Sequence, residues 1–155
     1  LLVHESIARR FIPRLFEKYR GAGVEICGCD KIREIDSEVR PASADDYHAE
    51  YLDLKLAVKI VSDIDEAVRH IDEFGSDHTE SIVSENHETI DEFIRRIQSS
   101  VVMANASTRF SDGGQMGLGA EIGISTTKLH AYGPMGVNDL TTRKYVIRGA
   151  GQIRS

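Results

Sequence analysis

The chain has 155 residues, of which 41% are hydrophobic and 28% are charged, a composition typical of a globular domain with one core. Its 25 acidic and 19 basic residues give a net charge of -6, which argues against a nucleic-acid-binding surface because such surfaces concentrate positive charge. No apolar run approaches the roughly 20 residues of a membrane-spanning helix, so we expect no membrane partner.

The first residues, LLVHES, contain neither an initiator methionine nor a signal peptide, and they are typical of the interior of a longer chain. Cys27 and Cys29 are the only cysteines, and they lie too close together on one predicted strand for an easy disulfide. Free cysteines are the default in a reducing compartment, so we expect a cytoplasmic protein.

The first third of the chain predicts a helix and a strand. Apolar residues recur at helical spacing through 5–19, and Gly21 and Gly23 are expected to end this helix. Pro13 lies inside the pattern, and because an interior proline removes a backbone donor we expect a kink or a helix start near Ile12. A short strand at 24–28 follows, with Ile26 and Cys27 on opposite faces. Residues 30–47 predict a loop with room for one turn of helix.

The middle of the chain alternates strands and helices. Its predicted elements are a strand at 54–60, a helix from Ser62 or Asp63 to Phe74 that Gly75 ends, a strand at 79–84, a helix that Asn86 caps, and a strand at 101–104. The first strand alternates apolar and polar residues, which is typical of a strand with one face in water. The second helix is expected to bury Ile90, Phe93, Ile94 and Ile97. The β-α-β-α-β order indicates a parallel sheet with right-handed crossovers.

The stretch from 105 to 126 departs from both periodicities. Polar side chains and one guanidinium follow directly after the strand at 101–104, which is where ligands bind in open α/β sheets. The glycines that come next are Gly113, Gly114, Gly117, Gly119 and Gly123. They miss the GxGxxG dinucleotide motif, because Ile122 stands at the third glycine position and a polar loop precedes them. A loop of this length is usually functional.

Residues 142–148, TRKYVIR, alternate again and predict a last strand. Its apolar faces are thin, so the strand is expected either at a sheet edge or completing the sheet of a second subunit. The histidines are scattered without the spacing of zinc ligands, so we expect no metal site.

Two blocks of the sequence resemble a known family. NASTRFSDGGQMGLGAEIGIST at 105–126, followed by KLHAYGPMG at 128–136, resembles the C-terminal signature of the gamma-glutamyl phosphate reductase family, also called glutamate-5-semialdehyde dehydrogenases, within the aldehyde dehydrogenase superfamily. EYLDLKLAVKIVSDIDEA, from Glu50 onward, resembles the superfamily's glutamate-led block. The resemblance implies a three-layer α/β fold with a parallel sheet, as a partial catalytic domain of aldehyde dehydrogenase type at 1–139 and a C-terminal oligomerisation strand and tail at 140–155.

The resemblance also implies an activity. It is the NADPH-dependent reduction of L-glutamyl 5-phosphate to L-glutamate 5-semialdehyde in proline biosynthesis, an oxidoreductase reaction in which a cysteine thiolate displaces phosphate. In the family that cysteine precedes the segment that resembles LLVHESIA, so it is expected upstream of Leu1 and the chain alone is expected to be inactive. Cys27 and Cys29 are then buried structural residues, because no neighbouring histidine or lysine indicates an activated thiol.

The resemblance assigns roles to individual residues. Glu50 matches the glutamate that accepts hydrogen bonds from the nicotinamide ribose of NADP(H), although Asp53 and Leu54 replace the superfamily's common Gly-Pro pair; the alternative is an exposed charge ahead of a strand. The residues expected around the substrate are Asn105, Ser107, Thr108, Arg109 and Phe110.

Arg109 is expected to pair with a substrate carboxylate, the alternative being a surface or subunit-interface arginine, and Phe110 alternatively only packs. Tyr132 stands where the family more often has arginine. The expected partners are a small-molecule substrate and further copies of the chain, as a dimer or higher oligomer.

Two other functions are open at this point. The chain could serve only as an assembly or binding module, or it could belong to an aldehyde dehydrogenase with a different acyl substrate. The ASTRF segment at 106–110 favours the glutamyl branch over the second of these.

Overall fold

The structure is a computed structural model that describes residues 1–120, 122–128 and 131–154. Its elements in chain order are β1 (Leu2–His4), α1 (Glu5–Gly21), β2 (Glu25–Gly28), α2 (Asp30–Arg33), β3 (Arg40–Pro41), α3 (Ala44–His48), β4 (Lys55–Val61), α4 (Ile64–Phe74), β5 (Thr79–Ile82), α5 (His87–Arg96), β6 (Val101–Ala104), the 3-10 helix η1 (Thr108–Phe110), β7 (Ile122–Ile124) and β8 (Gly133–Met135). Among the described residues, no helix has the length and apolarity needed to cross a membrane.

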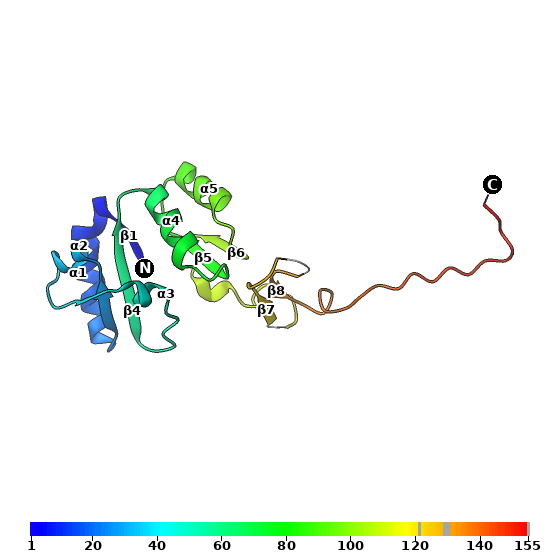
Figure 1. Cartoon of the computed structure of the whole chain (residues 1–155), viewed down its shortest axis with the longest axis horizontal. Helices are drawn as coiled ribbons and strands as arrows, with labels where there is room; N and C mark the ends of the chain where they lie inside the picture. The colour runs from blue at the N-terminus through cyan, green and yellow to red at the C-terminus, as the bar shows by residue number, and fades with distance from the viewer. Residues whose placement is uncertain (121, 129–130, 155) are drawn as a thin grey trace.

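A parallel sheet with the strand order β1-β4-β2-β3 organises the first half of the chain. β4 is an interior strand of this sheet: Ile60 lies opposite Val3 of β1, and Leu56 lies opposite Ile26 of β2. Figure 1 shows α1 and α2 on one side of β4 and α4 with α5 on the other. Helices on both sides of a parallel sheet are the layered α/β arrangement that the sequence predicted.

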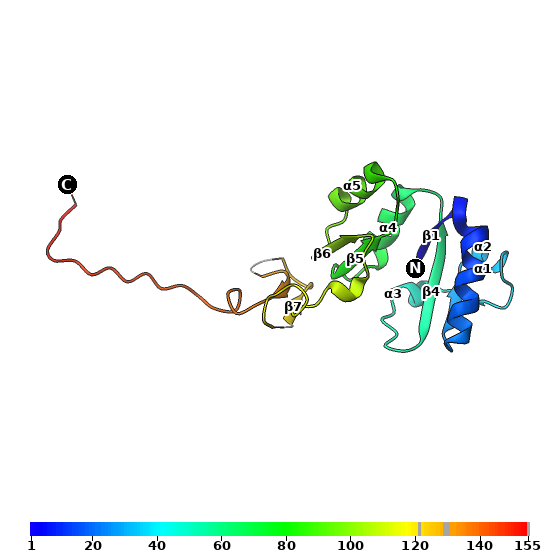
Figure 2. The same ribbon diagram turned by 180° about the vertical axis from the view of Figure 1, so that it is seen from behind.

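The remaining strands form two smaller sheets. β5 and β6 pair in parallel, and β7 and β8 form an antiparallel hairpin. Figure 2 shows this hairpin beside β5 and β6, with the last residues of the chain extending away from it. The predicted β-α-β-α-β unit at 54–104 is therefore divided between two sheets, a division that hydrophobic periodicity does not reveal.

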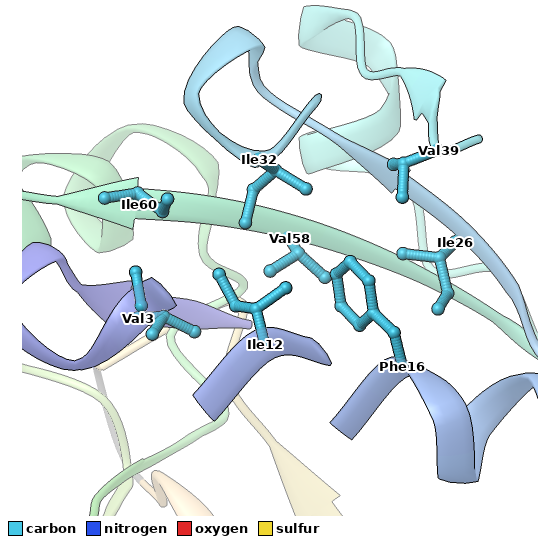
Figure 3. Packing of buried hydrophobic residues seen from close by; sticks show 9 residues of the cluster. Val3, Ile12, Phe16, Ile26, Ile32, Val39, Val58 and Ile60 are labelled. Carbon is cyan, nitrogen blue, oxygen red and sulfur yellow. The ribbon is translucent and has the colours of Figure 1, made fainter. Parts of the chain in front are cut away.

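The largest core lies between α1, α2 and the four-stranded sheet. Its buried members are Val3, Ala8, Ile12, Phe16, Ile26, Ile32, Val39, Val58 and Ile60, and Figure 3 shows Phe16 and Ile12 directed from α1 toward the sheet. Gly28 allows Ile32 to approach, because a β-carbon at this position would lie 2.5 Å from Cγ2 of Ile32. A smaller core joins α4, α5 and the β5–β6 pair through Val68, Phe93 and Ile97.

Helix α1 does not start near Ile12, which was one of the two outcomes predicted at Pro13. The helix begins at Glu5, where the Nδ1 atom of His4 accepts a hydrogen bond from the Ser6 amide at 3.2 Å, and it continues through Pro13. Pro13 lies on the exposed face, as does Arg9, so the carbonyl that loses its helical donor can bond to water. Gly23 has a φ of 76° and ends the helix as expected.

Three further predictions were wrong in part. Residues 30–47 hold α2, β3 and α3, which are too short to show a hydrophobic period. Ile94 is 44% exposed, because α5 packs through Ile90, Phe93 and Ile97. The predicted water-facing side of β4 is only partly exposed: the Lys59 side chain is 28% exposed, and its ammonium lies 3.4 Å from the carboxylate of Glu66 on α4.

The structure forms no strand at 142–148, where the alternating pattern predicted one. Tyr145, Val146 and Ile147 are exposed. Among the described residues none pairs with this segment as a neighbouring strand. Pairing with a second copy of the chain stays a prediction.

We expect the fold to lose stability when His70 is protonated. The His70 ring packs on Tyr47 and Phe74 at centroid distances of 4.9 and 4.6 Å, and its Nδ1 atom has no described partner. Burial lowers the pKa of His70 to about 4, with a smaller contribution from the Lys59 and N-terminal charges, which Glu66 opposes. The unfolded chain therefore binds the proton first, and this stability is complete above about pH 6.5 and lost as the pH falls toward 4.

Urea unfolding at pH 7 and pH 5 tests this expectation. The wild-type chain should lose roughly 1–2 kcal/mol more than His70→Phe over this interval, a figure reduced for the solvent that reaches the ring. His87→Gln, at an exposed histidine, is the control and should behave like the wild type. An identical loss in wild type and His70→Phe would contradict the role of His70.

Candidate functional site

The carboxyl ends of β5 and β6 are joined by Asn105, which the sequence placed at the substrate. Asn105 has a positive φ of 53°, and its side-chain amide pairs with the backbone of Ser84: Oδ1 accepts from the Ser84 amide at 2.9 Å, and Nδ2 donates to the Ser84 carbonyl at 3.0 Å. Both ends of the amide are occupied, so the structure gives Asn105 a role in holding the two strand ends together. Substrate binding by Asn105 stays a prediction.

The 3-10 helix η1 presents the other four predicted residues. Ser107 caps it, with Oγ accepting from the Arg109 amide at 3.3 Å, and the Ser111 amide donates to the Thr108 carbonyl at 3.0 Å. The Thr79 hydroxyl of β5 donates to the Ser111 hydroxyl at 2.8 Å and ties the end of η1 to the sheet. The side chains of Arg109 and Phe110 are therefore held on a fixed turn beside β5.

A cavity of about 330 Å³ lies at this turn. Its lining residues are Arg109, Phe110, Asp112 and Gln115. The Arg109 guanidinium has no hydrogen bond or ion pair with another described residue, so it is available to an anion. Phe110 is 55% exposed and provides an apolar wall. Arg109 and Phe110, which the sequence predicted around the substrate, thus line one cavity with Asp112 and Gln115, to which the sequence assigned no role; substrate binding by these residues stays a prediction.

Glu50 lies on the exposed connection between α3 and β4, without a hydrogen bond or ion pair to any described residue. The next residue anchors this connection: the Tyr51 hydroxyl donates to Oδ1 of Asp46 at 2.9 Å and lies 3.4 Å from Sγ of Cys27. Leu52 follows with a positive φ of 50°. Glu50 is therefore an accessible carboxylate next to a fixed residue. In both Figure 1 and Figure 2 this connection and η1 lie toward the lower edge of the molecule.

Asp46 is the residue to which the Tyr51 hydroxyl is bonded, and it has further partners of its own. Its carboxylate pairs with the Arg40 guanidinium and accepts from the Ser43 amide and hydroxyl, each at 2.8 Å. The hydrogen bond from Arg40, followed by those from Ser43, holds the pKa of Asp46 far below its usual range. Burial, the Cys27 contact and the Asp46 bond raise the pKa of Tyr51. The carboxylate thus stays ionised and Tyr51 stays protonated as its donor.

Replacing Tyr51 with phenylalanine should lower the free energy of unfolding by about 1 kcal/mol, because the hydroxyl's bonds to Asp46 are lost while the ring remains. Urea unfolding measures the change. Tyr145→Phe, at a fully solvated tyrosine, is the matched control and should leave the midpoint unchanged. Equal midpoints for all three proteins would show that the Tyr51 hydroxyl does not anchor the connection.

The two cysteines are free, as expected. Cys27 is fully buried in β2, with Sγ 3.6 Å from the Leu56 carbonyl, and Sγ of Cys29 accepts from the Ile60 amide at 3.5 Å. These contacts support the structural interpretation of both thiols. No group of three possible metal ligands occurs in the described part of the chain.

Tyr132 attaches the β7–β8 hairpin to the preceding loops. Its hydroxyl lies 2.8 Å from the Asp77 carbonyl and 3.0 Å from the Gln98 carbonyl. Lys128 lies over the Tyr132 ring, 5.1 Å from its centroid, and pairs with the Asp77 carboxylate at 3.3 Å. The tyrosine therefore has a structural role here, at a position where the resemblance implied arginine.

No protein-family model matches the chain. Over 155 residues it is 56% identical to a gamma-glutamyl phosphate reductase of Desulfatibacillum aliphaticivorans, and over 154 residues it is 51% identical to the protein of that name from Geotalea daltonii. The chain spans 37% of the length of each relative.

The fold agrees with the sequence comparison. A crystal structure of gamma-glutamyl phosphate reductase from Thermotoga maritima matches the whole chain with a TM-score of 0.91 at 50% identity, over 37% of that protein's chain. The resemblance inferred from 105–136 and from the Glu50 block is thereby confirmed, together with the α/β class. By sequence over its whole length and by fold, the chain is similar to gamma-glutamyl phosphate reductases.

Proposed function

We propose that a full-length protein carrying this chain reduces L-glutamyl 5-phosphate to L-glutamate 5-semialdehyde with NADPH, as an oxidoreductase of proline biosynthesis. The observation that carries the proposal is the match of the entire chain, at 51–56% identity, to proteins named for this activity. The η1 cavity supports it, because an unpaired guanidinium suits a substrate with an α-carboxylate and a phosphate.

Glu50 is the residue that we assign to the cofactor. NADPH supplies the hydride when it is bound. An ionised carboxylate only accepts hydrogen bonds, so it suits the paired hydroxyls of a ribose, and Glu50 is exposed with no described partner to compete. The Tyr51 anchor holds the backbone beside it. Glu50 would thus bind and orient the nicotinamide ribose.

The covalent step needs a thiolate that neither cysteine of this chain suits. Cys27 is fully buried, and the sulfur of Cys29 already accepts a backbone hydrogen bond. We therefore place the nucleophile outside this chain, whose residues would orient substrate and ribose. A purely non-catalytic module and a different acyl substrate remain the competing proposals, and the tests below separate them from reductase activity.

Growth without proline tests the proposal. We define the hybrid protein as the D. aliphaticivorans relative with this chain in place of its corresponding segment. In a bacterium that lacks its own gamma-glutamyl phosphate reductase, the hybrid protein should restore growth without added proline, as the unmodified relative does. A folded, accumulating hybrid protein that leaves growth dependent on proline would overturn the proposal.

The exposed segment 142–148 carries a proposal about assembly. Its alternating residues have no ladder partner within the described chain, and an unpaired strand edge is a ready template for another chain. We propose that it completes a sheet of a second copy, which makes the protein at least a dimer.

Val146→Pro should weaken this association at least roughly tenfold, because proline removes a ladder donor. Val146→Thr keeps the amide and the branched shape and serves as the control. Light scattering of the chain at tens of micromolar measures the mass. A folded wild-type chain that is monomeric, or a Val146→Pro variant that associates as strongly as the wild type, would contradict the proposal.

A further inference from the structure

We infer that Asp112 recognises the α-ammonium group of the substrate, so that the η1 cavity selects an amino-acid head group by both of its charges. The inference rests on the proposed function, and it assigns the substrate class at the same site. L-Glutamyl 5-phosphate carries an α-carboxylate and an α-ammonium on one carbon. A site that binds both charged groups would bind less tightly any substrate that lacks the carboxylate or the ammonium.

The lining of the cavity carries the inference. Arg109 lies on η1 and Asp112 follows three residues later, and both line the same space of about 330 Å³, which is within the usual range of about 300–1,000 Å³ for small-molecule pockets. Arg109 makes no ion pair within the described residues, so its charge is not consumed by a neighbour. A cation and an anion that line one cavity complement a zwitterion.

Asp112 is held in place by its own backbone turn. Its Oδ1 atom accepts from the Gln115 amide at 2.9 Å, and the Met116 amide donates to the Asp112 carbonyl at 2.9 Å. Just before it, Ser111 is tied to Thr79 of β5. A carboxylate offers about four lone-pair positions, so Asp112 can keep its contacts within the chain and still accept a bond from an ammonium.

The chain contains a matched control for this arrangement. Oδ2 of Asp139 accepts from the Gly136 amide at 2.9 Å, so this carboxylate is also held by a backbone amide three residues away. Asp139 does not line the cavity. Asparagine at either position keeps an oxygen for the amide and removes the charge. Each substitution removes one carboxylate charge, and only Asp112 lines the cavity.

The test is steady-state kinetics of the hybrid protein with NADP and phosphate, in the direction that oxidises the aldehyde. Three aldehydes separate the two charges: L-glutamate 5-semialdehyde has both groups, 5-oxopentanoate lacks the amine, and 4-aminobutanal lacks the carboxylate. For each aldehyde, kcat/KM of the variant is divided by kcat/KM of the unsubstituted hybrid protein. Cyclisation lowers the free aldehyde concentration equally for both proteins, so it does not affect this ratio.

Asp112→Asn should lower kcat/KM roughly 10- to 100-fold for L-glutamate 5-semialdehyde and 4-aminobutanal, and by less than about threefold for 5-oxopentanoate. Arg109→Gln should instead lower kcat/KM for the two aldehydes that carry the carboxylate, and should leave kcat/KM for 4-aminobutanal nearly unchanged. Asp139→Asn should leave all three ratios near one. An Asp112→Asn variant that loses the same factor on all three aldehydes would overturn the inference while leaving the reductase proposal intact.

Binding to the chain itself gives a second measurement that does not need turnover. L-Glutamate should shift the amide resonances of 109–115 more than glutarate, which lacks the amine, or 4-aminobutyrate, which lacks the α-carboxylate. Asp112→Asn should make L-glutamate and glutarate equivalent. A wild-type chain that responds equally to L-glutamate and glutarate would contradict the inference. A hybrid protein inactive on every aldehyde, with the L-glutamate preference intact, would overturn only the reductase proposal.

Discussion

Phe16→Ala should lower the free energy of unfolding by about 3–5 kcal/mol. The Phe16 side chain is fully buried between α1 and the four-stranded sheet, in the cluster that contains Ile26 and Val58 (Figure 3). The loss combines the transfer of the ring to water with the cavity that it leaves, since the strands behind it are held by their hydrogen-bonded neighbours. Urea unfolding, with midpoint and slope both fitted, measures it.

Phe11→Ala is the matched control, because Phe11 lies on the same helix but is 41% exposed. It should cost clearly less than Phe16→Ala, since two fifths of the Phe11 surface is already in water. Equal losses at Phe11 and Phe16 would show that α1 does not pack on the sheet through the described face.

The second large effect is expected at Glu50, in the hybrid protein. Glu50→Gln should lower kcat/KM for NADP by roughly 10- to 150-fold, the equivalent of about 1.5–3 kcal/mol for a charged hydrogen bond. The change is nearly isosteric and Glu50 is exposed, so the unfolding midpoint should not move. Steady-state kinetics with NADP varied at saturating aldehyde and phosphate give the constant.

Glu73→Gln supplies the comparison for Glu50. Glu73 is an exposed carboxylate on α4 without a described partner, and it has no assigned role. Its substitution should leave the kinetics unchanged. If Glu50→Gln behaves in the same way, Glu50 is an ordinary surface charge, and the ribose-binding assignment fails.

Elements whose signals are local could be predicted from the sequence. Helix α4 begins after Asp63, whose carboxylate accepts from the Glu66 amide at 2.7 Å, and α5 begins after Asn86, which accepts from Thr89 at 3.1 Å. Each cap needs only residues three apart. The contact between β4 and α4 could not be predicted, because the alternation at 54–60 does not show that Glu66 of α4 lies beside Lys59.

In the candidate site, too, local features could be predicted from the sequence and contacts between distant residues could not. Arg109 and Phe110 could be identified from residue type and position after a strand, and they line the cavity. The amide of Asn105 has the same polar character, but its partner Ser84 lies 21 residues away, and this pairing is invisible without the fold. No role was assigned to Asp112 from the sequence, although its carboxylate lies three residues after the only guanidinium of the loop and lines the cavity.

The most direct test of the central claim is NADP reduction by the hybrid protein with L-glutamate 5-semialdehyde, measured with and without phosphate. The proposed function predicts turnover that requires both the aldehyde and phosphate, with none from the 155-residue chain alone. A folded hybrid protein without turnover would contradict it, as would an equal rate when phosphate is left out.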